Sequence, residues 1–193
     1  MIEQLDRLDQ HITLAINNLG SQSTDFFWVT MSQKEIWFPL YLAVLAVLII
    51  RLGWKKAGIV ALSIILTIVA CDQFANLIKD GVGRLRPVYN SWMIEHGLRY
   101  LEGRGNFYGF FSAHAANSFG FAISSSIGLK NDLKHSYKPY TIGIMIWAAL
   151  VGISRIFCGK HYFGDVLVGT MVGLLFGWLL ALCAREAIRR LKL

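Results

Sequence analysis

Residues 166–184 read VLVGTMVGLLFGWLLALCA, which is a run of nineteen residues without a charge. A helix of about twenty apolar residues crosses the hydrocarbon core of a bilayer, so this run predicts a transmembrane helix. Hydrophobic residues make up 55% of the chain and charged residues only 16%, which is more apolar than is usual for a soluble domain. We therefore expect a membrane protein, and 193 residues are enough for a single domain over 1–193.

Further apolar runs lie upstream. Residues 57–78 carry one charge, at Asp72, whereas 36–50 and 139–154 are uncharged but shorter and need flanking aromatic or snorkelling side chains to complete a span. Residues 115–129 are rich in Ser, Gly and Ala, a composition typical of a helix packed among other helices. We expect an all-α, polytopic transmembrane helix bundle of about five spans, or six if residues 22–34 dip into the membrane. The five lie near residues 36–51, 57–78, 113–129, 139–156 and 163–184.

Two smaller patterns belong to the ends of the chain. Residues 1–20 predict an amphipathic helix that either lies on the membrane surface or packs on the bundle, and the acidic residues among the first ten leave no apolar core for a signal peptide. Its apolar positions are Ile2, Leu5, Leu8, Ile12, Ala15, Ile16 and Leu19. In the last span Gly169, Gly173 and Gly177 form a ridge of small residues, which we expect to pack against another helix.

Three polar clusters lie at the edges of the apolar runs. They are Lys79 with Arg86-Pro87, then Ser112-Ala113-His114, then Ser154-Arg155 with His161 and Asp165. With five spans, the loops fall into two sets, and all three clusters belong to the set that contains the N-terminal helix, residues 79–113 and residues 155–162. The clusters are therefore predicted to form one site at one end of the bundle.

The orientation of that site follows from the basic residues. The other set of loops carries ten Lys and Arg residues, against nine in the set that holds the clusters. Seven of those nine lie in or between the clusters, where a phosphate ligand would account for them, which leaves Arg7 and Lys34. The positive-inside rule then favours a cytoplasmic location for the set of loops that lacks the clusters. We expect a bacterial inner (cytoplasmic) membrane protein with its site facing the periplasm or outside.

The residues of the clusters suit phosphoryl transfer. Lys79, Arg86 and Arg155 would neutralise a phosphate, with the two arginines as planar forks. Ser112 can donate its hydroxyl, and the backbone N–H groups of Ala113 and the next residue, at the start of a helix, could hold a phosphate oxygen. Arg84, outside this set, is expected to be a surface cation.

His161 and Asp165 are four residues apart and share one face if that segment is helical. The carboxylate can then accept the Nδ1 proton, which leaves Nε2 as a nucleophile; the alternative is a structural cap. His114 would protonate the leaving oxygen on the opposite side of the phosphorus.

A metal-dependent mechanism is the competing interpretation. Two-metal phosphatases need several carboxylate ligands, and beside Asp165 this side offers few, among many cations. Asp72 shares a helical face with Lys79 and is expected to be buried and paired with a basic group, in a structural role. Cys71, Cys158 and Cys183 lack CxxC spacing, so neither a disulfide framework nor a zinc site is predicted. We expect no metal and no cofactor.

The spacing Lys79-x6-Arg86-Pro87, Ser112-x-His114 and Ser154-Arg155-x5-His161-x3-Asp165 resembles the type 2 phosphatidate phosphatase superfamily. That superfamily includes integral-membrane lipid phosphatases, glucose-6-phosphatase and the vanadium haloperoxidases. The first and third motifs match in full. In the second, the family usually has Pro-Ser-Gly-His, and here Phe111 and Ala113 replace the Pro and Gly while the serine and histidine are kept.

The resemblance implies an acid phosphatase/haloperoxidase-like helical core with an extracytoplasmic site and no metal requirement. By matched position it implies that His161 is the nucleophile through a phosphohistidine, Asp165 its orienter and His114 the proton donor. The implied phosphate ligands are Lys79, Arg86, Ser112 and Arg155.

We therefore expect a lipid phosphatase in the bilayer. Its candidate substrates are undecaprenyl diphosphate, lipid A, phosphatidylglycerophosphate and phosphatidate, and no nucleic-acid partner is expected; the oligomeric state is left open. The alternatives are a vanadate-dependent peroxidase, whose relatives are soluble, and a lipid-phosphate binding or transport protein, which would need no activated imidazole.

Overall fold

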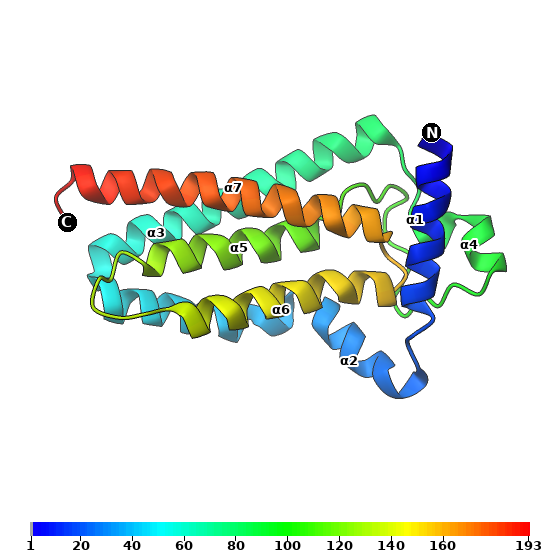
Figure 1. Ribbon diagram of the computed structural model, residues 1–193, viewed down its shortest axis with the longest axis horizontal. Helices are drawn as coiled ribbons and strands as arrows, with labels where there is room; N and C mark the ends of the chain where they lie inside the picture. Colours follow the sequence, from blue (N-terminus) through cyan, green and yellow to red (C-terminus); the bar gives the residue numbers. More distant parts are fainter. Residues whose placement is uncertain (1) are drawn as a thin grey trace.

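The computed structural model describes residues 2–193 as a helical protein (Figure 1). Within these residues the β-structure is limited to an isolated antiparallel bridge between Leu85 and Tyr108, so the expected all-α class is confirmed. The helices are α1 (Ile2–Asn17), α2 (Gln22–Ser32), α3 (Phe38–Val82), α4 (Ser91–Glu95), α5 (Ala113–Leu129), α6 (Lys138–Phe157) and α7 (Phe163–Arg190), with short 3-10 turns η1 (Glu35–Trp37) and η2 (Pro87–Tyr89).

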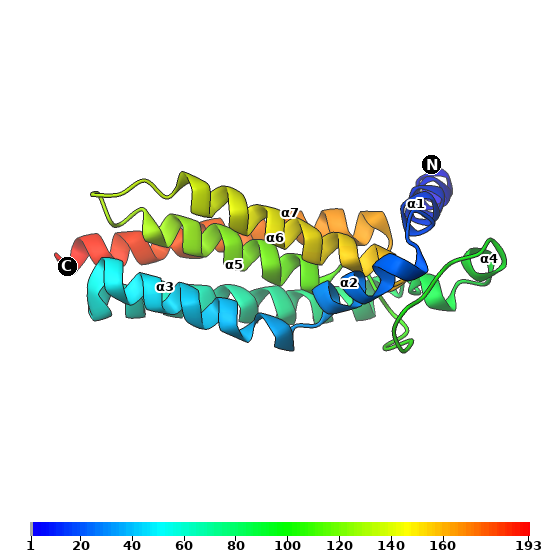
Figure 2. The same ribbon diagram turned by 90° about the horizontal axis from the view of Figure 1, so that it is seen from below.

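The bundle is built from α3, α5, α6 and α7. Helix α3 breaks at Gly53, whose φ of 74° lies in the region that only glycine adopts easily. The chain reverses its direction at this break. The two arms of α3, residues 38–52 and 54–82, both extend along the long axis of the bundle with α5, α6 and α7 (Figures 1 and 2). Three described stretches are long and apolar enough to cross a membrane, namely Glu35–Val82, Lys138–Phe157 and Phe163–Arg190. With 11 residues, α2 is well short of a crossing.

Helix α5 occupies the interior of the bundle. Twelve of its 17 residues are buried, which confirms the expectation drawn from its small side chains. The glycine ridge of α7 packs on it: a Cβ at Gly169, Gly173 or Gly177 would lie closer than 3.0 Å to backbone atoms of α5 or its N-cap. The predicted helix–helix contact is confirmed, and it allows the two backbones to approach as small residues do in membrane bundles.

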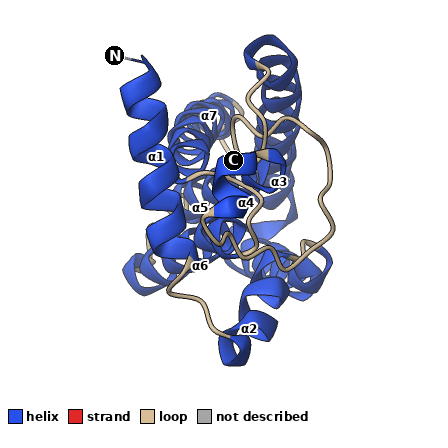
Figure 3. Ribbon diagram, turned by 90° about the vertical axis from the view of Figure 1, so that its right-hand side faces the viewer, coloured by secondary structure: helices blue, strands red, loops and turns tan. Residues whose placement is uncertain are grey.

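Helix α1 lies across one end of the bundle instead of along it (Figures 1 and 3). The face that it packs on the bundle is polar: Thr13 Oγ1 accepts from the backbone N–H of Phe163 at 2.8 Å, and Asn17 Nδ2 donates to the carbonyl oxygen of Ile156 at 2.9 Å. Part of the apolar stripe points outward, with Leu8 56% exposed, whereas Ile16 packs against Ala115, Ile156 and Val166 of the bundle; the side chain of Ile2 lies outside those described. The helix therefore packs on the bundle and also leaves part of its apolar face, including Leu5 and Leu8, exposed.

The same end carries the loop 83–112 with α4 and the turn 158–162 (Figure 1). The opposite end carries the break at Gly53, the loop 130–137 and the C-terminus (Figure 2). The two sets of loops that span parity predicts therefore lie at opposite ends of the molecule.

Candidate active site

The three polar clusters converge on one cavity of about 390 Å³ at the α1 end of the bundle. This is the convergence that the loop parity predicts. Each cluster reaches the cavity from the end of a helix or from a loop that helices hold in place. The lining includes Lys79 from the last turn of α3, Arg86 from the following loop, Ala113 and His114 from the first turn of α5, Arg155 from the last turn of α6, and His161 from the turn before α7.

His161 is almost completely buried, at 2% exposure. Its Nε2 lies 3.2 Å from Nη1 of Arg86. Because a guanidinium can only donate, Nε2 acts as the acceptor and the ring proton belongs on Nδ1. That Nδ1 faces Oδ2 of Asp165 at 3.4 Å, which is longer than a full hydrogen bond. The arrangement leaves the Nε2 lone pair on the side of the cations, where a phosphate would bind.

The surroundings of His161 keep its imidazole neutral. Burial lowers the pKa of His161 well below its ordinary value of 6.5, and the positive charges of Arg86 and Arg155 lower it further. A neutral imidazole carries the lone pair that a nucleophile needs. A bound phosphate dianion would cancel much of this positive field.

Two of the cations that line the cavity, Arg86 and Arg155, are buried arginines. Arg86 Nη1 donates to the carbonyl oxygen of Lys160 at 3.2 Å, and Arg155 donates to the hydroxyl of Ser32 and lies 3.5 Å from Glu102. The Nε atoms of both arginines are buried without a hydrogen-bond partner within residues 2–193. Buried donors without partners are costly, and an anion in the cavity is a ligand that would satisfy them.

The second cluster is divided between the helix start and the cavity. Ser112 is completely buried, and its Oγ accepts from the backbone N–H of Ala115 at 3.4 Å, which caps α5. Its own backbone N–H donates to the carbonyl oxygen of Asp165 at 3.0 Å. Ala113 and His114 line the cavity, so the first turn of α5 is directed at the place where a phosphate would lie.

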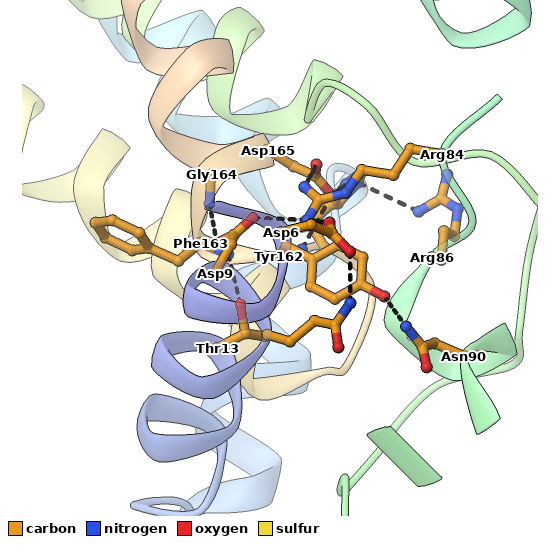
Figure 4. A network of polar contacts seen from close by, with 12 residues as sticks. Asp6, Asp9, Thr13, Arg84, Arg86, Asn90, Tyr162, Phe163, Gly164 and Asp165 are labelled. Atoms are coloured by element: carbon orange, nitrogen blue, oxygen red, sulfur yellow. Dashed lines mark hydrogen bonds and ion pairs between the residues drawn. The ribbon is translucent and has the colours of Figure 1, made fainter. Parts of the chain in front are cut away.

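The expectation that Arg84 is a surface cation is wrong. Its side chain is only 18% exposed, and its Nη1 donates to Oδ1 of Asp165 at 2.8 Å. Its Nη2 lies 2.7 Å from Asp6 and 2.8 Å from Asp9, both on α1 (Figure 4). The bridge at Leu85 keeps the segment extended, and alternate side chains of an extended segment point the same way. The two arginines of Arg84-Leu85-Arg86 are therefore both directed inward.

The prediction that Asp72 pairs with a basic group is also wrong. Its Oδ1 accepts from the Nδ2 amide of Asn117 at 2.8 Å instead of pairing with a basic group, and both residues line the cavity.

The cavity also has an apolar wall, formed by Met31, Trp37, Phe38 and Tyr41, which the sequence patterns did not reveal. Trp37, Phe38 and Tyr41 lie in the span predicted near residues 36–51, but an apolar run does not show which of its side chains face the polar clusters.

The helical membrane bundle and the phosphate-adapted cavity define the class of an integral-membrane phosphoric ester hydrolase. The chain belongs to the PAP2 superfamily, whose family model matches residues 56–189. That range contains every cluster residue named above, whereas α1, α2 and the first arm of α3 lie outside it.

Two curated relatives match most of the chain. It is 34% identical over 194 residues to "Lipid A 4'-phosphatase" of Bacteroides thetaiotaomicron, which covers 100% of this chain and 84% of the relative. It is 29% identical over 177 residues to "Lipid A 4'-phosphatase" of Porphyromonas gingivalis, which covers 91% of this chain and 72% of the relative.

Two crystal structures share the fold. A transmembrane PAP2-type phosphatidylglycerolphosphate phosphatase from Bacillus subtilis superposes with a TM-score of 0.75 at 19% identity and covers 95% of this chain and 87% of its own. LpxE of Aquifex aeolicus superposes with a TM-score of 0.63 at 23% identity, over 88% and 92% of the two chains. The chain is thus an integral membrane enzyme of this family.

Proposed function

We propose that this chain is a lipid A phosphatase that removes the 4'-phosphate monoester, through a phosphohistidine on His161. The observation that carries the proposal is the cavity in which two imidazoles and the cations Lys79, Arg86 and Arg155 meet an apolar wall. The cations suit a phosphate, and the wall suits the acyl chains of a lipid. The names of the two relatives support lipid A and the 4' position.

In the first half of the proposed reaction, Nε2 of His161 attacks phosphorus and the bond from phosphorus to the sugar oxygen breaks. His114 gives that oxygen its proton, so the dephosphorylated lipid leaves as an alcohol. Asp165 accepts a hydrogen bond from Nδ1–H of His161 and stabilises the imidazolium as the new P–N bond forms. Lys79, Arg86, Arg155 and the backbone N–H of Ala113 hold the equatorial oxygens.

In the second half, water attacks the phosphorus of the phosphohistidine. His114, now neutral, takes a proton from that water, the P–N bond breaks and inorganic phosphate leaves. His161 recovers its Nε2 lone pair. Ser112 supports this machinery from behind by starting α5 at the position where Ala113 and His114 reach the cavity.

The same proposal includes the place of the enzyme in the cell. The two arms of α3 and the helices α5, α6 and α7 would be five spans of the bacterial inner membrane, with the cavity facing the periplasm. The exposed apolar stripe of α1, which contains Leu5 and Leu8, would lie in the interface of that leaflet. The polar headgroup would then meet the cations while the acyl chains stay at the level of the apolar wall.

The proposal is tested with bisphosphorylated lipid A in detergent and EDTA, by comparing the wild-type protein with His161→Ala. We expect release of inorganic phosphate by the wild type, a lipid product lacking the 4'-phosphate by mass spectrometry, and no release by the variant. Undecaprenyl diphosphate, phosphatidylglycerophosphate and phosphatidate serve as competing substrates.

Each outcome decides a part of the proposal. Faster turnover of one of the other lipids would overturn the assignment of lipid A, and loss of the 1-phosphate would overturn the position. Equal turnover by the wild type and His161→Ala would remove His161 from the mechanism.

A further inference from the structure

An ion-pair cluster lies next to Asp165, the carboxylate that faces His161 (Figure 4). At its centre is Arg84, whose two Nη atoms contact three carboxylates: Asp165 at 2.8 Å, Asp6 at 2.7 Å and Asp9 at 2.8 Å. The guanidinium also lies over the ring of Tyr162, 3.9 Å from its centroid. Arg84 is not among the residues that line the cavity.

The carboxylate of Asp165 depends on this cluster. Asp165 is completely buried, and an ionised carboxylate away from water is costly unless it is paired and hydrogen-bonded. Its Oδ1 accepts from Arg84 at 2.8 Å, and its Oδ2 accepts from the backbone N–H of Tyr162 at 3.0 Å. These two bonds fix both oxygens, and therefore the direction in which Oδ2 faces Nδ1 of His161.

Helix α1 holds Arg84 in this position. Asp9 uses one oxygen for Arg84 and the other, Oδ1, to accept from the backbone N–H of Gly164 at 2.7 Å. One side chain of α1 therefore joins Arg84 to the first turn of α7, which is the turn that carries Asp165. Burial alone would lower the pKa of Arg84, but Asp165 and Asp9 raise it above its ordinary value, so the positive charge of Arg84 is permanent.

We propose that Arg84, held by Asp6 and Asp9 of α1, is a positioning residue that keeps Asp165 ionised and aimed at Nδ1 of His161. It acts through Asp165 and does not contact the phosphate, because its two Nη groups are directed at carboxylates. This inference rests on the proposed function, and it assigns to α1 a part in catalysis although α1 lies outside residues 56–189, which the family model matches.

The test compares Arg84→Gln, Arg84→Lys and the control Arg104→Gln on bisphosphorylated lipid A, with inorganic phosphate as the competitive inhibitor. Arg104 is an exposed arginine of the same loop, 5.9 Å from the ring of Tyr89. We expect Arg84→Gln to lower kcat by about 10–100-fold, as loss of an orienting partner does. KM and the inhibition constant of phosphate should stay unchanged, since Arg86 and Arg155 are intact.

Arg84→Lys should regain part of the lost kcat, because an ammonium keeps the charge but cannot bridge three carboxylates as a fork. Arg104→Gln should match the wild type. A raised KM and a weaker inhibition by phosphate in Arg84→Gln, with kcat unchanged, would overturn the proposal in favour of direct phosphate binding. An unchanged kcat would also overturn it.

Folding is checked by the melting profile of each purified variant. If Arg84→Gln does not fold, the folded Arg84→Lys carries the test; if neither folds, Arg84 serves stability and the proposal is wrong. An absence of wild-type turnover above that of His161→Ala would instead contradict the proposed function itself, so the two failures are distinct.

Discussion

The two ends of the bundle carry similar ion pairs in very different surroundings. At the cavity end, Arg84 and Asp6 lie 2.7 Å apart, with side chains that are 18% and 45% exposed. At the opposite end, Arg190 and Glu186 are also 2.7 Å apart, but their side chains are 78% and 38% exposed. The same contact distance thus occurs in a partly buried network and on an open helix end.

Burial gives these contacts their different importance. Exposed ion pairs contribute little because water and salt screen them, whereas a buried charge that loses its partner is strongly destabilising or functionally costly. The number of basic residues is nearly equal in the two sets of loops, ten against nine. Convergence on a buried cavity, and not basic content, therefore marks the functional end.

The largest expected effect contrasts an arginine from each end. Arg155→Ala should lower kcat/KM by about 10²–10³-fold, because it removes a preorganised donor from the charge that develops in the transition state. Arg189→Ala, at the exposed end, should leave kcat/KM unchanged. Both are measured by phosphate release from lipid A, after the melting profile has shown that each variant is folded. Similar losses at the two ends would break the comparison.

The second prediction concerns pH. Burial, Arg86, Arg155 and Lys79 lower the pKa of His161 below 6.5, so activity of the wild type should persist below that pH before its acidic limb begins. In Arg86→Gln one of the cations that face the imidazole is gone, which favours the protonated ring, so the acidic limb of kcat/KM should move to higher pH. A profile of kcat/KM reports the free enzyme; an acidic limb that stays in place, or moves to lower pH, would contradict the assignment of His161.

A third prediction concerns packing between the ends. Gly173→Ala should destabilise the protein by roughly 1–3 kcal/mol, as overpacking does, because the new methyl group meets the backbone of Ala116. Gly143→Ala in α6 is the matched control, since a Cβ there meets nothing within 4 Å. Thermal unfolding in detergent measures both. Equal melting temperatures for the two variants would mean that α5 and α7 are not in close contact.

The smallest effect is expected at the exposed end. Glu186→Gln removes the acidic partner of Arg189 and Arg190, yet neither the melting temperature nor phosphate release should change measurably. A clear loss of either would show that this end contributes more than its exposure suggests.

Much of the fold could be predicted from the sequence because long apolar runs have few alternatives in a membrane. The runs at 57–78, 139–154 and 166–184 became α-helices, and the small residues of 115–129 became the interior helix α5. The convergence of the three clusters also followed, since loops that are separated by an even number of spans lie at the same end of the bundle.

The parts that were missed depend on contacts between distant segments. Arg84 lies outside the motif spacing, and only the extended conformation at Leu85, which the bridge to Tyr108 holds, directs its side chain to the same side as that of Arg86. The polar stripe of Asp6, Asp9, Thr13 and Asn17 is also visible in the sequence, but the pattern leaves open whether this helix lies on the membrane surface or packs on the bundle. In the structure, Thr13 and Asn17 of the polar face bind the bundle. The periodicity of the sequence does not distinguish this arrangement from packing through the apolar face.

The most direct test of the central claim is to trap the covalent intermediate. His114→Ala is mixed with 4-nitrophenyl phosphate, whose leaving group needs no proton, and the reaction is quenched in base, where phosphohistidine survives. Because the variant lacks the base that activates water, the account predicts a phosphorylated peptide whose modified residue is His161. A phosphate found on Ser112 instead, or release of 4-nitrophenol with no phosphorylated protein at any time, would contradict it.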